Sequence, residues 1–262
     1  LKQTGVPVGL MLAGILAPAL VEAYGWQIAL LVCSAICAGT AVALQPLRAR
    51  FDTDRNPAQP LTSAAIRGNI ASVLREPALR LLCFTMFSFV GLQALFTGFF
   101  VLYLVQGLGN DLARGGLIFS IAVAVAVPAR IGWGWVGSRL MRPDRLLALL
   151  GISMSAAAVL TASLQADWPM WLLVLSASLF SATAVSWHGV LLAEVARLSP
   201  PGRIGATTGV VLSFGDAGSL VLPLLFSAAL ALADSYRIGF VIGGLPTLVV
   251  GLYSLRVVAR GG

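Results

Sequence analysis

Long continuous apolar runs constrain this chain more than any other feature of its sequence. Eight of them can be placed, at residues 4–22, 26–45, 79–105, 114–137, 146–164, 169–195, 205–233 and 237–258. A helix of about 20 apolar residues spans a bilayer, and these runs lack the two-residue alternation of membrane β-strands. With 58% hydrophobic and 10% charged residues, a water-soluble domain could not bury this much apolar surface. The sequence therefore predicts an all-α integral membrane protein, a polytopic helical bundle with eight transmembrane helices.

The basic residues mark one side of the membrane. Of 17 Lys and Arg residues, 14 lie at one set of run ends, two (Arg114 and Arg237) lie at the opposite ends, and Arg130 lies inside a run. Since Lys and Arg favour the cytoplasmic side, the loop 46–77 and the C-terminus are predicted to be cytoplasmic. The net charge of +7 is explained by this orientation signal, so the lipid bilayer is the expected partner and nucleic acid is not. Sixteen arginines against one lysine indicate a GC-rich bacterial genome, and hence the bacterial inner membrane.

The loop at residues 46–77 separates two apolar runs from the following six. Its second part, LTSAAIRGNIASVLREP, spaces its apolar residues at helical intervals. This pattern predicts an amphipathic helix, which could lie on the cytoplasmic membrane face or pack on the protein's own loops. Both alternatives remain open at this point.

The chain lacks the residue sets that metal sites and intramembrane enzymes need. It has one histidine, and its three cysteines lie in or near apolar runs without metal-ligand spacing. No ATP-binding G-x-x-x-x-G-K-[ST] motif and no nucleophile–base set occurs. We therefore predict no metal, no cofactor and no enzymatic activity, with an intramembrane enzyme as the alternative from another class.

A weak internal repeat relates the first and seventh runs. TGVPVGLMLAGILAP (4–18) and TGVVLSFGDAGSLVLP (208–223) share Thr-Gly, a glycine nine residues later, and a proline near the same depth. A repeat of this size is typical of transporters built from two similar halves.

Four stretches of the chain resemble the major facilitator superfamily. KQTGVPVG resembles the fifth helix of bacterial members, and GWVGSRLMRPDR resembles the G-x-x-x-D-R-x-G-R-R signature between helices eight and nine. WHGVLLAEVARLSPPGRIGATTG resembles the tenth helix and the turn into the eleventh, and SYRIGF resembles the start of the twelfth. The resemblance implies helices five to twelve of a twelve-helix transporter. The start at Leu1 is accordingly interpreted as that of a fragment, whose partners would include the missing N-terminal helices of the same protein.

The same resemblance implies a division of the chain into three parts. Residues 1–45 would be the last two helices of the N-terminal half, 46–77 the cytoplasmic loop between the halves, and 78–262 the C-terminal six-helix bundle.

The stretch ARIGWGWVGSRLMRPDR, residues 129–145, is the main candidate for gating. Arg130 lies about two turns inside its run, where a charge is costly, so it should reach the cytoplasmic interface or pair with an acid. In the family the corresponding signature latches the cytoplasmic side; here Ser138 and Met141 replace the usual aspartate and glycine. We predict gating or structural roles, rather than substrate binding, for Arg130, Gly134, Arg139, Arg142, Glu194 and Arg197.

Five other residues are candidates for lining a substrate cavity: Gln93, Phe96, Trp187, His188 and Asp216. The first four lie in runs that correspond to helices seven and ten, which line the cavity in the family. The alternatives that involve no substrate are helix packing for the aromatic residues and an interhelical hydrogen bond for His188. Asp216 lies near the middle of its run, where it could carry a proton, pair with Arg130, bind a cationic substrate or form a structural ion pair.

These features predict a secondary active transporter that moves a small organic solute by alternating access. Proton coupling is an option, and an organic anion is the favoured substrate class because of Arg130. Multidrug efflux is the alternative within the family. It is disfavoured because Gly14 and Pro18 are not adjacent, which leaves the antiporter-type G-P signature incomplete.

Overall fold

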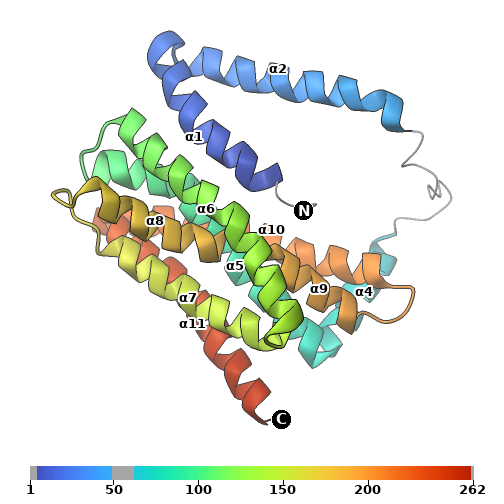
Figure 1. Cartoon of the computed structure of the whole chain (residues 1–262). Coiled ribbons are helices and arrows are strands. Elements are labelled where there is room, and N and C mark those ends of the chain that lie inside the picture. The colour runs from blue at the N-terminus through green and yellow to red at the C-terminus, as the bar shows by residue number, and fades with distance from the viewer. Residues whose placement is uncertain (1–4, 49–61, 261–262) are drawn as a thin grey trace.

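The computed structural model describes residues 5–48 and 62–260, and this part of the chain is helical without any β-strand (Figure 1). The elements are α1 (Gly5–Tyr24), α2 (Trp26–Leu44), the 3₁₀ turn η1 (Gln45–Leu47), α4 (Ser63–Arg75), α5 (Pro77–Leu102), the π-helical turn η2 (Tyr103–Gly107), α6 (Leu112–Arg139), α7 (Pro143–Ala162), α8 (Met170–Ala184), α9 (His188–Leu198), α10 (Ile204–Ala233) and α11 (Tyr236–Arg260). The predicted all-α fold class is confirmed.

The predicted membrane spans correspond closely to these helices. Seven segments of the described chain are long and apolar enough to cross a membrane, and Val8–Tyr24 is a shorter apolar helix. The run at 169–195 differs from the expectation of one continuous helix, because it folds as α8 and α9 with a break at residues 185–187. Side chains that bond to the backbone around this break account for it, as described below.

Close helix contacts hold the bundle together around α5. Helix α10 packs along α5, where Gly218 approaches the backbone of Phe87 so closely that a Cβ would overlap the Phe87 carbonyl. Helix α1 packs on α6, where a Cβ on Gly116 would overlap the carbonyl of Gly14. Glycine is needed at such crossings because any side chain would hold the two helices apart. In Figure 1, α1 lies beside α6, whereas α2 is joined mainly to α1.

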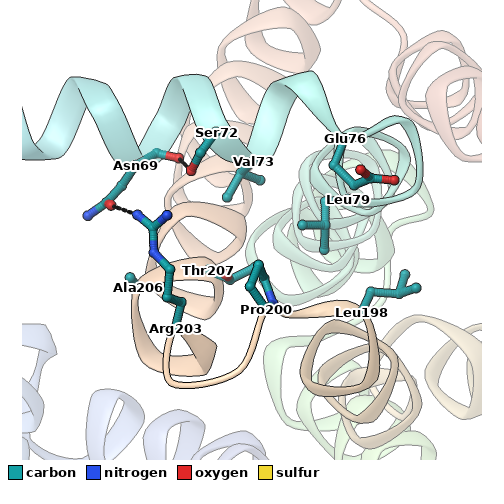
Figure 2. A pocket seen from close by; sticks show the side chains of 10 residues that line it. All are labelled: Asn69, Ser72, Val73, Glu76, Leu79, Leu198, Pro200, Arg203, Ala206 and Thr207. Atoms are coloured by element: carbon teal, nitrogen blue, oxygen red, sulfur yellow. Dashed lines mark hydrogen bonds between the residues drawn. The ribbon is translucent and has the colours of Figure 1, made fainter.

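Helix α4 is the predicted amphipathic segment, and its C-terminal part packs on the protein itself. Thr62 caps the helix by accepting a hydrogen bond from the backbone N–H of Ala65 at 3.2 Å. Val73 is buried, and the Arg203 guanidinium, just before α10, donates to the Asn69 side-chain oxygen at 2.6 Å (Figure 2). Ile66 in the N-terminal part remains 51% exposed. Packing on the protein's own elements therefore accounts for the second half of α4.

Candidate functional site

The helix break between α8 and α9 is the most unusual feature of the bundle interior. The α-helix ends at Ala184, and a new helix begins at His188 after the non-helical residues Val185, Ser186 and Trp187. All three of these residues are buried. A break leaves backbone carbonyls without helical donors, and in an apolar bundle each of them needs another partner.

Side chains on both sides of the break bond to these carbonyls. The Trp187 indole N–H donates to the Ala184 carbonyl at 2.8 Å, and the Trp133 indole N–H of α6 donates to the Ala182 carbonyl at 2.7 Å. The Ser186 hydroxyl donates in the opposite direction, to the Ala126 carbonyl of α6 at 3.1 Å. Hydroxyl and indole donors thus tie the break to α6.

Arg130 completes this arrangement from α6. Its guanidinium donates to the Val185 carbonyl, and one of its terminal nitrogens, Nη2, lies 3.5 Å from Nδ1 of His188. The Arg130 residue is only 8% exposed, so it does not extend to the protein surface. Arg130 was expected to reach the cytoplasmic interface or to pair with an acid; among the described residues its guanidinium instead donates to a backbone carbonyl at the break.

His188 and Trp187 form a stacked pair at the start of α9. Their ring centroids are 3.8 Å apart with an interplanar angle of 13°, and Trp187 also meets Phe89 of α5 edge-on at 5.4 Å. Trp187 is completely buried, whereas His188 is half-buried. Trp187 is thus a packing residue in the described structure, and His188 is placed between this packing and Arg130.

The other two candidates on α5 have different surroundings. Phe96 is fully buried among Phe100, Phe119 and Phe180, with ring centroids 4.8–5.5 Å away, as a packing residue would be. Gln93 is half-buried, and its side-chain oxygen is inaccessible and accepts no hydrogen bond from any described residue. The acceptor capacity of this buried amide oxygen is therefore unused in the described structure.

Asp216 lies on the exposed side of α10. The opposite side of this helix packs against α5 through residues such as Val211, Gly215 and Gly218. Within the described residues, the Asp216 carboxylate makes no hydrogen bond or ion pair, and no contact joins it to Arg130. The structure therefore does not bring Asp216 together with the group around the break.

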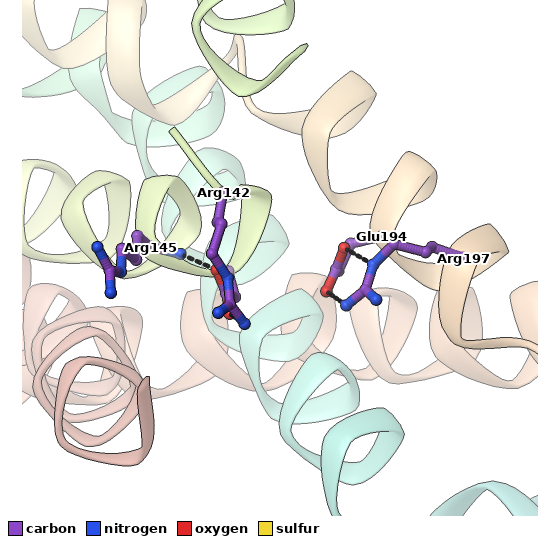
Figure 3. A network of polar contacts seen from close by, with 5 residues as sticks. Arg142, Arg145, Glu194 and Arg197 are labelled. Atoms are coloured by element: carbon purple, nitrogen blue, oxygen red, sulfur yellow. Dashed lines mark hydrogen bonds and ion pairs between the residues drawn. The ribbon is translucent and has the colours of Figure 1, made fainter. Parts of the chain in front are cut away.

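Of the predicted gating residues, Arg139, Arg142, Glu194 and Arg197 lie at or near the ends of α6, α7 and α9. The Arg197 guanidinium holds both oxygens of Glu194 at 2.8 and 2.6 Å, and the Glu194 side chain is only 4% exposed (Figure 3). Arg142 pairs with Asp144 at 2.8 Å. These two residues are spaced i, i+3 on one helix, a spacing at which oppositely charged side chains can pair.

Arg139 and Gly134 play no comparable part in the described structure. Arg139 is exposed at the end of α6, and a Cβ on Gly134 would meet nothing within 4 Å. The close contact in this stretch is made by Gly137, where a Cβ would lie 3.2 Å from the Leu146 side chain.

Sequence reasoning missed Trp133 and Ser186. A signal for Trp133 was present, because a Trp within an apolar run carries an indole N–H that needs an acceptor once it is buried. Its neighbour Trp135 carries the same signal, yet it is exposed. No sequence pattern distinguishes the two. In the described residues no group of three or more metal-ligating side chains is found.

One family model matches most of the chain. The model of the Major Facilitator Superfamily matches residues 1–223. Among solved structures, the chain is similar to the E. coli fucose:proton symporter FucP, with a TM-score of 0.63 and 15% sequence identity. The match covers 90% of this chain and 58% of the symporter, so the chain spans little more than half of that protein's length. No curated protein matches the chain.

Proposed function

The chain belongs to the major facilitator superfamily, and from this premise we propose that it acts in secondary active transport of a small organic solute by alternating access. The family assignment also confirms the predicted class of a multi-pass membrane protein, and the proposed activity is that of a transporter rather than an enzyme. We propose the division given by the resemblance, with residues 1–45 in one half of the transporter, 46–77 as the cytoplasmic loop and 78–262 as the C-terminal bundle. The bacterial inner membrane and the cytoplasmic placement of that loop are part of the proposal.

The observation that carries this proposal is the helix break beside Arg130. Secondary transporters commonly build their substrate sites from discontinuous helices, because an unwound segment exposes polar backbone groups inside the membrane. Here the break brings a half-buried imidazole and a guanidinium together, beside backbone carbonyls that already accept from indole and guanidinium donors. A guanidinium binds carboxylates well, so an organic anion is the proposed substrate class.

Gating is assigned to the helix that follows the break. Helix α9 begins at His188 and ends beside the Glu194–Arg197 ion pair, so a change at the break would shift this pair against α7. Arg130, Gly134, Arg139 and Arg142 would belong to the same gate. Gln93, Phe96, Trp187 and His188 remain proposed as cavity residues, with Phe96 and Trp187 supporting the wall from behind.

Asp216 is proposed as the proton-carrying residue. Its carboxylate has no partner among the described residues, and a carboxylate at membrane depth is costly unless it is protonated or faces water. Reversible protonation would couple the transport cycle to a proton gradient, as an alternative to ATP, for which the sequence has no binding motif.

Proton-linked flux in sealed vesicles tests the proposal. The full-length transporter, with the N-terminal helices that the resemblance implies, is reconstituted in proteoliposomes containing a pH-sensitive dye. Matched sets of small organic anions, neutral sugars and lipophilic cations are then added one at a time. We expect pH changes inside the vesicles with members of the anion set, and none after Asp216→Asn, while unlabelled-for-labelled anion exchange persists in that variant. Flux only with lipophilic cations would favour drug efflux instead, and absence of flux in every set would contradict transport.

A further inference from the structure

An open groove with a volume of about 1060 Å³ lies between α5, α10 and α11 and reaches the ends of α7 and α9. It is separate from the group of residues around the helix break. Most of its lining consists of apolar side chains that project from membrane-spanning helices, among them Leu81, Phe84, Leu222, Leu225, Leu245 and Val249.

Every charged residue of the groove lies at one end. Arg80 and Glu76 come from the start of α5, Arg142 and Asp144 from the start of α7, and Glu194 and Arg197 from the end of α9. The polar residues Thr85 and Ser88 farther along α5 satisfy their hydroxyls on carbonyls of their own helix, at 2.9 and 2.8 Å. The groove is therefore amphipathic along its length, with a charged end and an apolar body.

The arginines at the charged end keep donors available. Arg142 and Arg197 are paired with Asp144 and Glu194, yet their side chains remain 62% and 60% exposed. An arginine has five N–H donors, so a paired guanidinium can still bind a phosphate. The Arg80 side chain is exposed and makes no hydrogen bond or ion pair with any described residue.

We propose that this groove is a phospholipid site, with the lipid phosphate bound by Arg80, Arg142 and Arg197 and an acyl chain lying along α5, α10 and α11. The charge pattern matches this occupant at both ends, because an acyl chain needs apolar walls and a phosphate needs guanidinium donors. The three acids at the same end balance the three arginines, which suits a headgroup without excess negative charge. The lipid belongs to the cytoplasmic leaflet, a placement that rests on the proposed orientation of the protein.

Lipid binding to the purified, delipidated chain tests this site without any transport measurement. Native mass spectrometry would follow titration with dioleoyl-phosphatidylethanolamine and, separately, with dioleoylglycerol, which has the same acyl chains and no phosphate. We expect one tightly bound phosphatidylethanolamine and about tenfold weaker binding of dioleoylglycerol, because charge-assisted hydrogen bonds to the phosphate are lost. A zwitterionic lipid is chosen so that the net positive charge of the protein does not dominate binding.

Two matched pairs of variants locate the site. Arg80→Gln should weaken phosphatidylethanolamine binding about tenfold, whereas Arg67→Gln on the exposed face of α4 should leave it unchanged. Leu245→Trp should block the groove, while Leu179→Trp on α8, a leucine of the same 49% exposure outside the groove, should not.

The proposal is overturned by either of two results. One is equal affinity of the wild-type chain for the two lipids, a comparison that needs no variant and so does not depend on variant folding. The other is wild-type affinity in both Arg80→Gln and Leu245→Trp. Transport could fail in the vesicle assay while this site binds lipid, and the reverse also holds, so the two proposals stand or fall separately.

Discussion

Individual residues around the helix break show how a buried charge is tolerated in this bundle. Arg130 is placed where an isolated charge would be costly, and the Val185 carbonyl, released from helical bonding, accepts from it. The sequence alone indicated that Arg130 needs a partner. It could not indicate a backbone carbonyl, because every carbonyl in a continuous helix is already used and the break is visible only in three dimensions.

Trp133→Phe tests the contribution of one such residue. The change removes the indole N–H that bonds to the Ala182 carbonyl and leaves that acceptor unsatisfied. We expect the free energy of unfolding to fall by about 1 kcal/mol, which corresponds to a Tm lower by about 2–4 °C. Thermal unfolding in detergent measures it, with Trp135→Phe as the control because Trp135 is exposed. An equal shift in both variants would mean that the loss of indole volume, not the hydrogen bond, is responsible.

At the scale of whole elements, pairs of helices pack through small residues at a few crossings.

The lengths and positions of the helices could be predicted from the apolar runs, since an apolar run of about 20 residues is long enough to span a membrane as a helix. The break at 185–187 could not, because two of the donors that stabilise it, Trp133 and Arg130, come from α6, more than 40 positions earlier in the chain. Helix α4 was predicted from its periodicity, but its bond to Arg203 depends on a turn far along the sequence.

The crossing of α5 and α10 can be tested with two glycines of the same helix. Gly218→Ala places a methyl group against the Phe87 carbonyl and should destabilise the bundle by about 1–3 kcal/mol, as overpacking does. Gly209→Ala is the matched control, since a Cβ there meets nothing within 4 Å in the described structure. Denaturation monitored by circular dichroism in detergent compares the two. The close-packing account fails if Gly218→Ala is as stable as Gly209→Ala.

At the scale of the whole molecule, the arrangement of charges sets the orientation that we propose. Arginines gather at the ends of α6, α7 and α9, where the ion pairs of Glu194 and Asp144 also lie. The family could be predicted from short stretches spread over the chain, and the family model matches residues 1–223.

The substrate could not be predicted from the sequence. Few residues contact a substrate, and the charge and shape of the cavity that they form depend on how the helices pack.

Orientation can be measured with two engineered cysteines at opposite ends of α7. Ser138→Cys, at the end of α6 just before α7, and Ser163→Cys, directly after α7, both replace exposed residues. A membrane-impermeant maleimide should label Ser138→Cys only in inside-out vesicles and Ser163→Cys only in intact spheroplasts, each above the labelling of the parent chain. The reverse pattern would invert the topology and would move the proposed lipid site to the outer leaflet.

The way the helix break is satisfied also has a consequence for the order in which the protein is made. Synthesis starts at the N-terminus, so the N-terminal part of a nascent chain emerges from the ribosome first. Helix α6 therefore reaches the membrane before the residues of the break are synthesised. The Trp133 and Arg130 donors are therefore already embedded when Ala182 and Val185 arrive and need partners. Their carbonyls can be paired during insertion, and the break never has to exist as an isolated, unpaired segment in lipid.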